Sequence, residues 1–156
     1  MSEHGISNDV DWTRTGREVI GAQPFSELLG ATLETLSRDG VELRLTLTPA
    51  LNQHRGRVHG GVIGYLADNA IAFAAGPHLG PDIVTSDYAL NFCRPPTGSV
   101  LVARARVVTS GRTKAVVHCE VSSAEGGEER VCALAIGTVL VTDRSSPRVL
   151  AGGVAS

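Results

Sequence analysis

The chain has 156 residues, of which 42% are hydrophobic and 19% charged, and its formal net charge is −2; this suits one domain that buries about two thirds of its unfolded surface. The absence of a basic excess and the aromatic share of 4% argue against a surface that binds nucleic acid. The acidic N-terminus lacks the apolar segment of a signal peptide, and Asp68 and Asn69 interrupt the longest apolar run, which argues against a membrane span. We therefore expect a cytoplasmic protein without membrane contact.

The first third of the chain predicts a loose segment, a short helix and a hairpin. Residues 1–22 are polar, and we expect a flexible N-terminal arm with a short helix around residues 15–20. The segment from Pro24 to Gly30 predicts a short helix, because proline stands at its start and glycine closes it. Residues 31–49 predict a β-hairpin, because "RDG" supplies a turn and apolar residues at 41, 43, 45 and 47 alternate with polar ones after it.

The rest of the chain predicts one long helix followed by strands. From Gly61 to Ala75 the residues are apolar or small on every face, so we expect this helix to be enclosed. Without a βαβ repeat, the simplest enclosure is an antiparallel sheet wrapped around one long central helix, an α+β fold in a single domain at 23–143. We expect a disordered C-terminal tail at 144–156. The four strand-like runs are 83–95, 99–110, 113–124 and 128–142.

The three cysteines do not form the pattern of a metal site or a disulfide framework. Cys93, Cys119 and Cys132 are odd in number and share no CxxC spacing. We expect reduced thiols carried by strands, no structural zinc, and no metal or redox cofactor.

Asp68 is the one acidic residue in the predicted central helix. An unpaired buried charge is costly, so the simplest explanation is a solvent-facing stripe with Asn69, or an arginine partner. However, the residues one turn away on either side are Gly64 and Ala72, whose small side chains leave room for a ligand or another chain. We therefore favour a functional role for this carboxylate.

The sequence "HGG" stands where the central helix begins. The N–H groups of Gly60 and Gly61 lack intrahelical acceptors and lie at the positive end of the helix dipole. Glycine lets a ligand oxygen approach closely, which suits a developing oxyanion, although two glycines also simply allow a turn. Asp68 is eight residues beyond Gly60, roughly 12 Å along a helix. If the two groups cooperate, they must come from two antiparallel helices, which predicts a homodimer with two composite sites.

The segment "LNQHRGRVHGGVIGYLADNAIAFAA" at 51–75, with "NFCRP" at 91–95 and the predicted element order, resembles the hotdog-fold acyl-CoA thioesterases of the phenylacetic-acid-type (PaaI-like) group. The resemblance spans about residues 25–142. It implies a hotdog domain, hydrolysis of an aryl- or medium-chain acyl-CoA to a free acid and CoA, no cofactor, and a dimer or a homotetramer built from two dimers. The acyl group itself stays open.

The resemblance also implies catalytic roles. Asp68 is expected to be the general base or nucleophile, and the N–H of Gly60 in the partner subunit to polarise the thioester carbonyl. A side-chain amide before "HGG" is expected to place the water or the acyl group. Counting back from "HGG" favours Gln53, whereas "LN" favours Asn52 with one inserted residue. A hydroxyl from the following strand is expected at Thr85.

The resemblance also implies further binding residues, although the motifs that contain them are less specific. Ser86 is the next choice for the strand hydroxyl, His59 is expected to stabilise the turn by a hydrogen bond, and Gly61 is expected beside the substrate. His59 is also a lesser candidate for the base. Five further residues are candidates for binding the phosphates of CoA: Arg94, Ser110, Gly111, Arg112 and Thr113. The alternative is that they only form an ordinary strand end and a hairpin turn.

Two other functions fit parts of the pattern. A hotdog hydratase or dehydratase acting on enoyl or 3-hydroxyacyl thioesters would use a histidine with a helix carboxylate, such as His54 with Asp68, but the proline-rich loop of that group is missing here. A non-catalytic acyl-CoA sensor would leave the intact Asp68 unexplained. The sequence therefore favours the thioesterase.

Overall fold

The computed structural model describes residues 10–142. Residues 1–9 and the predicted tail at 144–156 lie outside the described residues. The predicted order of a short helix, two strands, a long helix and four strands is confirmed, with one additional α-helix before it and a 3-10 turn. The elements are α1 (Trp12–Gly21), α2 (Pro24–Leu29), β1 (Ala31–Ser37), β2 (Gly40–Thr46), the 3-10 turn η1 (Pro49–Leu51), α3 (Gly60–Leu79), β3 (Ile83–Phe92), β4 (Val100–Ser110), β5 (Lys114–Glu125) and β6 (Glu128–Val141).

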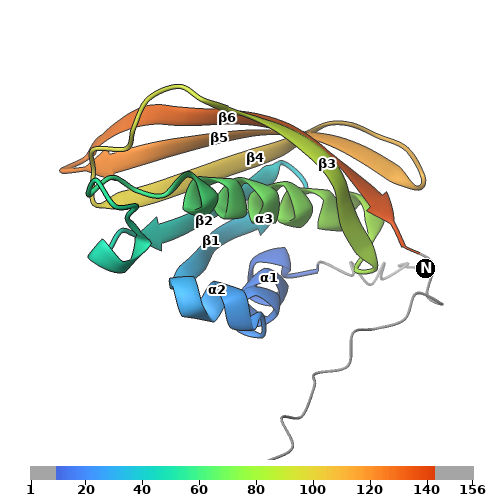
Figure 1. Cartoon of the computed structure of the whole chain (residues 1–156). Helices are drawn as coiled ribbons and strands as arrows, with labels where there is room; N and C mark the ends of the chain where they lie inside the picture. Colours follow the sequence, from blue (N-terminus) through green and yellow to red (C-terminus); the bar gives the residue numbers. More distant parts are fainter. Residues whose placement is uncertain (1–9, 143–156) are drawn as a thin grey trace, which may run out of the picture.

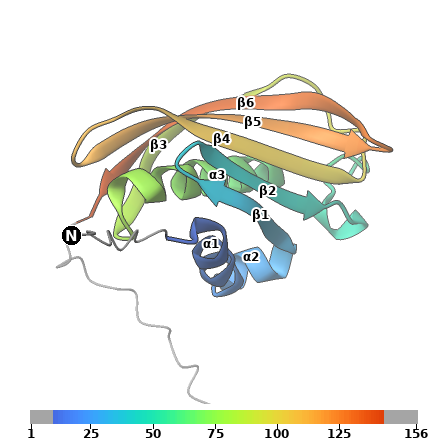
Figure 2. The ribbon, with the colours of Figure 1, turned by 180° about the vertical axis from the view of Figure 1, so that it is seen from behind.

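The six strands form one antiparallel sheet in the order β1-β2-β4-β5-β6-β3. The sheet curves around α3, as both views of the ribbon show (Figures 1 and 2). The predicted α+β class, an antiparallel sheet around one long helix, is therefore confirmed. Strand β3 follows α3 in the chain and pairs only with β6, so it forms one edge of the sheet, beside α3.

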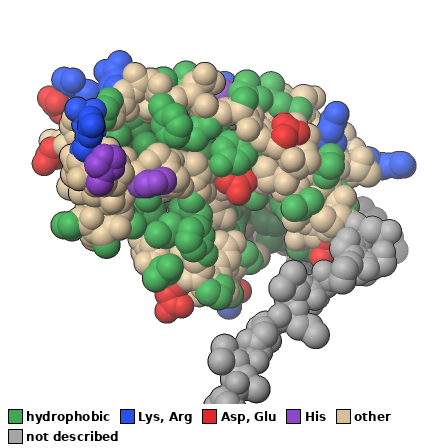
Figure 3. All heavy atoms as spheres, viewed as in Figure 1, with side chains coloured by type: hydrophobic (Ala, Val, Ile, Leu, Met, Phe, Trp, Pro, Cys, Tyr) green, Lys and Arg blue, Asp and Glu red, His purple; other side chains and the backbone are tan. Residues whose placement is uncertain are grey.

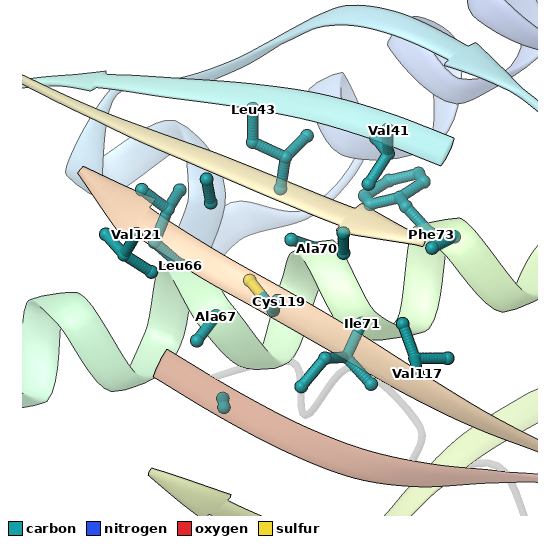
Figure 4. Packing of buried hydrophobic residues seen from close by; sticks show 14 of the residues in the cluster. Val41, Leu43, Leu66, Ala67, Ala70, Ile71, Phe73, Val117, Cys119 and Val121 are labelled. Atoms are coloured by element: carbon teal, nitrogen blue, oxygen red, sulfur yellow. The ribbon is translucent and has the colours of Figure 1, made fainter. Parts of the chain in front are cut away.

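The core lies between α3 and the concave face of the sheet. The fully buried helix residues Leu66 and Ile71 face sheet residues such as Leu43 and Val117 (Figure 4). Truncating a side chain like that of Leu66 to alanine costs about 2–5 kcal/mol in a packed core. In β2 every second residue is buried, because the strand turns alternate side chains toward the helix.

One stripe of α3 is not enclosed by its own chain, contrary to the expectation for every face. Tyr65, Asp68, Asn69, Ala72 and Gly76 are each only half-buried. They recur at intervals of three or four residues, so they lie along one side of the helix, away from the sheet. The apolar and small residues of this stripe are therefore available to a further molecule.

Helix α1 occupies the second half of the segment expected as a flexible arm, and it includes the helix expected at residues 15–20. Asp11 caps it by accepting a hydrogen bond from the Arg14 N–H at 3.0 Å. The Arg17 guanidinium donates to the carbonyls of Leu33 and Glu34 on β1, and Ile20 is buried. Residues 12–21 are thus packed on the edge strand β1.

A polar network joins α2 to α3 and explains Asn69. The Ser26 hydroxyl donates to Gln23 Oε1 at 2.6 Å and accepts from the Tyr65 hydroxyl at 2.6 Å. The Asn69 amide donates to the same oxygens and to Tyr65, and the Phe25 ring meets the Tyr65 ring edge-on. Asn69 is therefore a structural residue, and its neighbour Asp68 does not share this network.

The cysteines are free thiols. Cys119 on β5 and Cys132 on β6 are buried, and burial raises their pKa to about 12 and about 11, respectively. Cys93 lies just beyond β3 and is exposed. Within residues 10–142, no three His, Cys, Asp or Glu side chains are grouped to hold a metal ion. In the same range, no helix combines the length and the apolarity needed to cross a membrane.

Candidate functional site

The two glycines at the start of α3 differ in what their N–H groups do. His59 is the N-cap, and its Nδ1 accepts a hydrogen bond from the Gly61 N–H at 2.8 Å. This is the turn-stabilising bond expected of His59. Among residues 10–142, the Gly60 N–H has no hydrogen-bond partner. Gly60 is therefore the glycine whose donor is available to a ligand at the positive end of the helix dipole.

The ring of Phe92 borders this donor. A Cβ atom at Gly60 would lie 3.1 Å from Phe92 Cζ and 3.4 Å from Cε1, so the ring lies directly against the glycine. Phe92 is the last residue of β3 and is 60% exposed. An apolar aromatic surface thus stands beside the free N–H, where it can exclude water from a bound carbonyl group.

Asp68 carries a buried oxygen without a partner. Its Oδ1 atom is shielded from solvent and has no hydrogen-bond partner among the described residues. A carboxylate oxygen in this position is costly unless something else satisfies it. The arginine partner considered from the sequence is not found in the described part of the chain. Asp68 Oδ1 is therefore the one buried side-chain oxygen or nitrogen among the described residues that is left without a partner.

The space above Gly64, expected to be open, is partly filled by Tyr88 of β3. The Tyr88 hydroxyl donates to the Gly64 carbonyl at 3.3 Å, and a Cβ atom at Gly64 would lie 3.2 Å from Tyr88 Oη. Burial, together with the negative charge of Asp68, raises the pKa of Tyr88 above its usual value of 10.0. A neutral phenol therefore lies close to the Asp68 carboxylate. Strand alternation alone could not have predicted this position, because the bulge between Thr85 and Asp87 brings both Thr85 and Tyr88 to the helix-facing side.

The strand register separates the two hydroxyl candidates. Thr85 pairs with Val139, which is fully buried, so Thr85 also faces the helix. A β-bulge follows at Ser86, whose hydroxyl donates to Asp87 Oδ2 at 3.0 Å and to the Thr138 carbonyl at 3.3 Å. Thr85 is thus on the side of the sheet where Asp68 lies, whereas Ser86 is used in the local structure of the bulge.

The loop before "HGG" holds the two amide candidates differently. Gln53 Oε1 accepts from the Arg55 N–H at 3.0 Å, and the Gln53 N–H donates to the Arg57 carbonyl at 2.7 Å. Asn52 forms a β-bridge with Val58; its side chain is exposed and makes no hydrogen bond to another described residue. Gln53 therefore has a fixed side chain with its NH₂ group left to donate, and Asn52 a free one.

The residues proposed for CoA binding are not brought together within one chain. Arg94 follows the end of β3 that pairs with Ala133 of β6. The turn Ser110–Thr113 lies at the other end of the sheet, beside Leu140 of β6. Seven residues of β-strand separate these two points, or about 23 Å. In the same way, Asp68 and Gly60 lie about 12 Å apart along α3.

Exposed apolar residues flank the open side of α3. On one side lie Phe25 and Leu28 of α2, which are 57% and 78% exposed, and on the other Tyr88 and Phe92 of β3. Figure 3 shows hydrophobic side chains over α2 and along the edge of the sheet on this face. The outer edge of β3 has no neighbouring strand in the described chain. Such an edge beside an apolar surface is suited to pairing with another chain.

Comparison with known proteins places the chain in a family. Residues 55–130 match the model of the Thioesterase superfamily. A Deinococcus radiodurans protein named "Putative esterase" is 39% identical over 127 residues, which cover 80% of this chain and 84% of that protein. The crystal structure of a thioesterase family protein from Silicibacter pomeroyi has a TM-score of 0.77 and 30% identity, covering 83% of this chain and 96% of that one.

The structure of the E. coli PaaI protein, from the phenylacetic acid degradation operon, has a TM-score of 0.76 over 85% of this chain and 94% of that chain. At 21% identity, this likeness supports the fold alone. The matched segment 55–130 contains the start of α3, Asp68 and β3, the elements on which the resemblance to PaaI-like proteins was based. The chain is therefore a hotdog-fold member of the thioesterase superfamily, a family of hydrolases.

Proposed function

We propose that the protein hydrolyses an acyl-CoA thioester, with an aryl or medium-chain acyl group, to the free acid and CoA. The observation that carries this proposal is the buried, unpartnered Oδ1 of Asp68 on the open side of the central helix. A structural carboxylate would have a partner. A catalytic one has its oxygen satisfied only when water or substrate is bound.

The proposed reaction needs one carboxylate and one oxyanion donor. Asp68 takes a proton from water while the water oxygen attacks the thioester carbon, or attacks that carbon itself to form an anhydride that water then cleaves. The carbonyl oxygen becomes negative and is stabilised by the Gly60 N–H. The C–S bond then breaks, and the CoA thiolate leaves and takes up a proton. No metal or redox cofactor is required for this chemistry.

The site is proposed to form between two subunits. Asp68 and Gly60 lie too far apart on one helix to touch the same carbonyl group, whereas two antiparallel α3 helices would bring each Asp68 beside the Gly60 of the partner. The free edge of β3 and the exposed apolar residues around it support such a homodimer. Leu134 and Ile136, exposed on the outer face of β6, support a second contact and hence a homotetramer.

The other residues are proposed to position the substrate. Thr85 supplies a hydroxyl on the helix-facing side of β3, and Gln53 supplies amide donors from a fixed loop, with Asn52 as the alternative. Because Arg94 and the Ser110–Thr113 turn lie at opposite ends of the sheet, one CoA molecule would meet both only if they came from different subunits. The substrate and the free thiols suit a cytoplasmic protein.

The test is thiol release from a panel of arylacetyl-, hydroxyaryl- and medium-chain acyl-CoA thioesters, followed with a disulfide reagent. Exposed Cys93 would itself react, so all samples carry Cys93→Ser. We expect Asp68→Asn to lower turnover at least about 100-fold. Asp87→Asn is the control and should keep turnover, because it changes an exposed carboxylate of β3 that points away from α3.

Other outcomes would favour the two alternatives. Binding of acyl-CoA without thiol release from any substrate would favour the sensor. Consumption of an enoyl-CoA without thiol release would favour the hydratase, for which His54 would be the histidine. His54 is exposed in the loop before α3.

A further inference from the structure

Tyr88 is held in a slot between two glycines. On β6 its cross-strand partner is Gly137, where a Cβ atom would lie 3.0 Å from Tyr88 Cβ. On α3 the hydroxyl lies over Gly64, where a Cβ atom would be 3.2 Å from Oη. A larger residue at Gly137 would crowd Ile71 and the base of the Tyr88 side chain, and one at Gly64 would crowd its hydroxyl. The two glycines thus leave room at both ends of this side chain, and the hydrogen bond to the Gly64 carbonyl places its hydroxyl.

The hydrogen bonding of the Tyr88 hydroxyl leaves it as an acceptor. A phenol has one O–H to donate, and here it is directed to the Gly64 carbonyl at 3.3 Å. The oxygen lone pairs are then free to accept from another group. Asp68 lies one helical turn beyond Gly64, and its charge acts on the phenol. The hydroxyl of Tyr88 and the carboxylate of Asp68 therefore border the same space.

We propose that Tyr88 Oη holds the attacking water against Asp68. This inference rests on the proposed hydrolysis and makes Asp68 its general base. A water molecule has two O–H groups, and the site offers two acceptors: the half-buried Asp68 carboxylate, which makes no hydrogen bond to another described residue, and Tyr88 Oη. With both protons bound, a lone pair of the water is directed away from them, toward the thioester carbon.

The atoms balance through the step. The O–H bond directed at Asp68 breaks and its proton passes to the carboxylate, while a C–O bond forms to the thioester carbon. The second proton stays on the new hydroxyl and keeps its hydrogen bond to Tyr88. The C–S bond then breaks, the thiolate takes up the proton held by Asp68, and the products are a carboxylic acid and CoA.

The test compares the only two tyrosines of the chain. Tyr88→Phe removes the acceptor and keeps the ring in its slot. Tyr65→Phe removes the hydroxyl that binds Ser26 and Asn69, so it should lower the melting temperature while keeping kcat. For Tyr88→Phe we expect kcat to fall about 10- to 100-fold. Its KM, and its inhibition by free CoA, should stay within about twofold of the wild-type values, because water placement does not contribute to substrate binding.

The outcomes separate this inference from the function on which it rests. If the wild type releases no thiol, both are overturned. If the wild type is active and Asp68→Asn is not, but Tyr88→Phe loses less than about threefold in kcat, only the role of Tyr88 is overturned. The same conclusion follows if Tyr88→Phe changes KM and CoA inhibition together with kcat, or if it does not fold, since Tyr88 would then be a packing residue.

Discussion

His59 provides the sharpest test of the helix start, because a capping role and a catalytic role predict opposite results. Its Nδ1 accepts one hydrogen bond of 2.8 Å from the Gly61 N–H at an exposed N-cap. Replacing such a cap with alanine costs about 1 kcal/mol, whereas asparagine caps as well or better. We therefore expect His59→Ala to be less stable by about this amount and His59→Asn to match the wild type.

The expected change in melting temperature follows from the size of the domain. With an unfolding entropy of about 2.1 cal/mol/K per residue over the described chain, a loss of about 1 kcal/mol lowers the melting temperature by roughly 3 to 4 °C. The change is measured by thermal unfolding of both variants at one protein concentration, since an oligomer melts in a concentration-dependent way. Thiol release is measured on the same samples.

The kinetic outcome decides between the two roles. As a cap, His59 can be replaced by asparagine with kcat unchanged within about threefold, whereas loss of a general base costs about 10²- to 10⁴-fold. If His59→Asn melted like the wild type but lost activity in that larger range, His59 would be the base. The proposed assignment to Asp68 would then be refuted.

Three further predictions concern the same face. Gly60→Pro should fold, because proline suits the first helical position and His59 already has an extended backbone with φ −66° and ψ 132°. Proline and alanine both add a Cβ atom 3.1 Å from the exposed Phe92 ring, so Gly60→Ala is the matched control for that contact. Losing the N–H should lower kcat about 10²- to 10³-fold relative to Gly60→Ala, which keeps it. In a Tyr65→Phe background, ultraviolet titration of the remaining tyrosine should give a Tyr88 pKa above 10.0, and adding Asp68→Asn should lower that pKa because one of its causes is removed. A single turnover in ¹⁸O water should leave no label in the Asp68 carboxylate if it is a base; label there would show that it is the nucleophile.

Much of the fold was predictable because its signals are local. The alternation in β2 places Val41, Leu43 and Leu45 on one side, and all three are buried, because a strand with one buried face must alternate. The sequence also contains a periodic pattern for α1, although the polar composition of residues 1–22 favoured a flexible arm. Trp12, Gly16 and Ile20 recur every four residues, so they share the helix face that meets β1.

The details of the site depend on contacts that no local pattern contains. The spacing of "HGG" and Asp68 predicts both groups, but the availability of the Gly60 N–H depends on the side-chain conformation of His59. The approach of Tyr88 to Asp68 depends on the bulge in β3, which shifts the register by one residue. In the sequence, the segment around Arg94 and the β4–β5 turn are both basic loops, and nothing local separates them. Only the sheet topology places them at opposite ends of β6.

Subunit complementation tests directly whether the site is shared between chains. In a hybrid dimer of Asp68→Asn and Gly60→Pro subunits, one composite site carries both defects, and the other combines the intact Asp68 of one chain with the intact Gly60 of the other. Random exchange of equal amounts makes half of the dimers hybrid, so about a quarter of the wild-type sites should be restored. A site within one chain would stay inactive in every mixture, because each chain lacks one group. Recovery near a quarter, absent when either variant is incubated alone, therefore requires that Asp68 and Gly60 act across the subunit boundary.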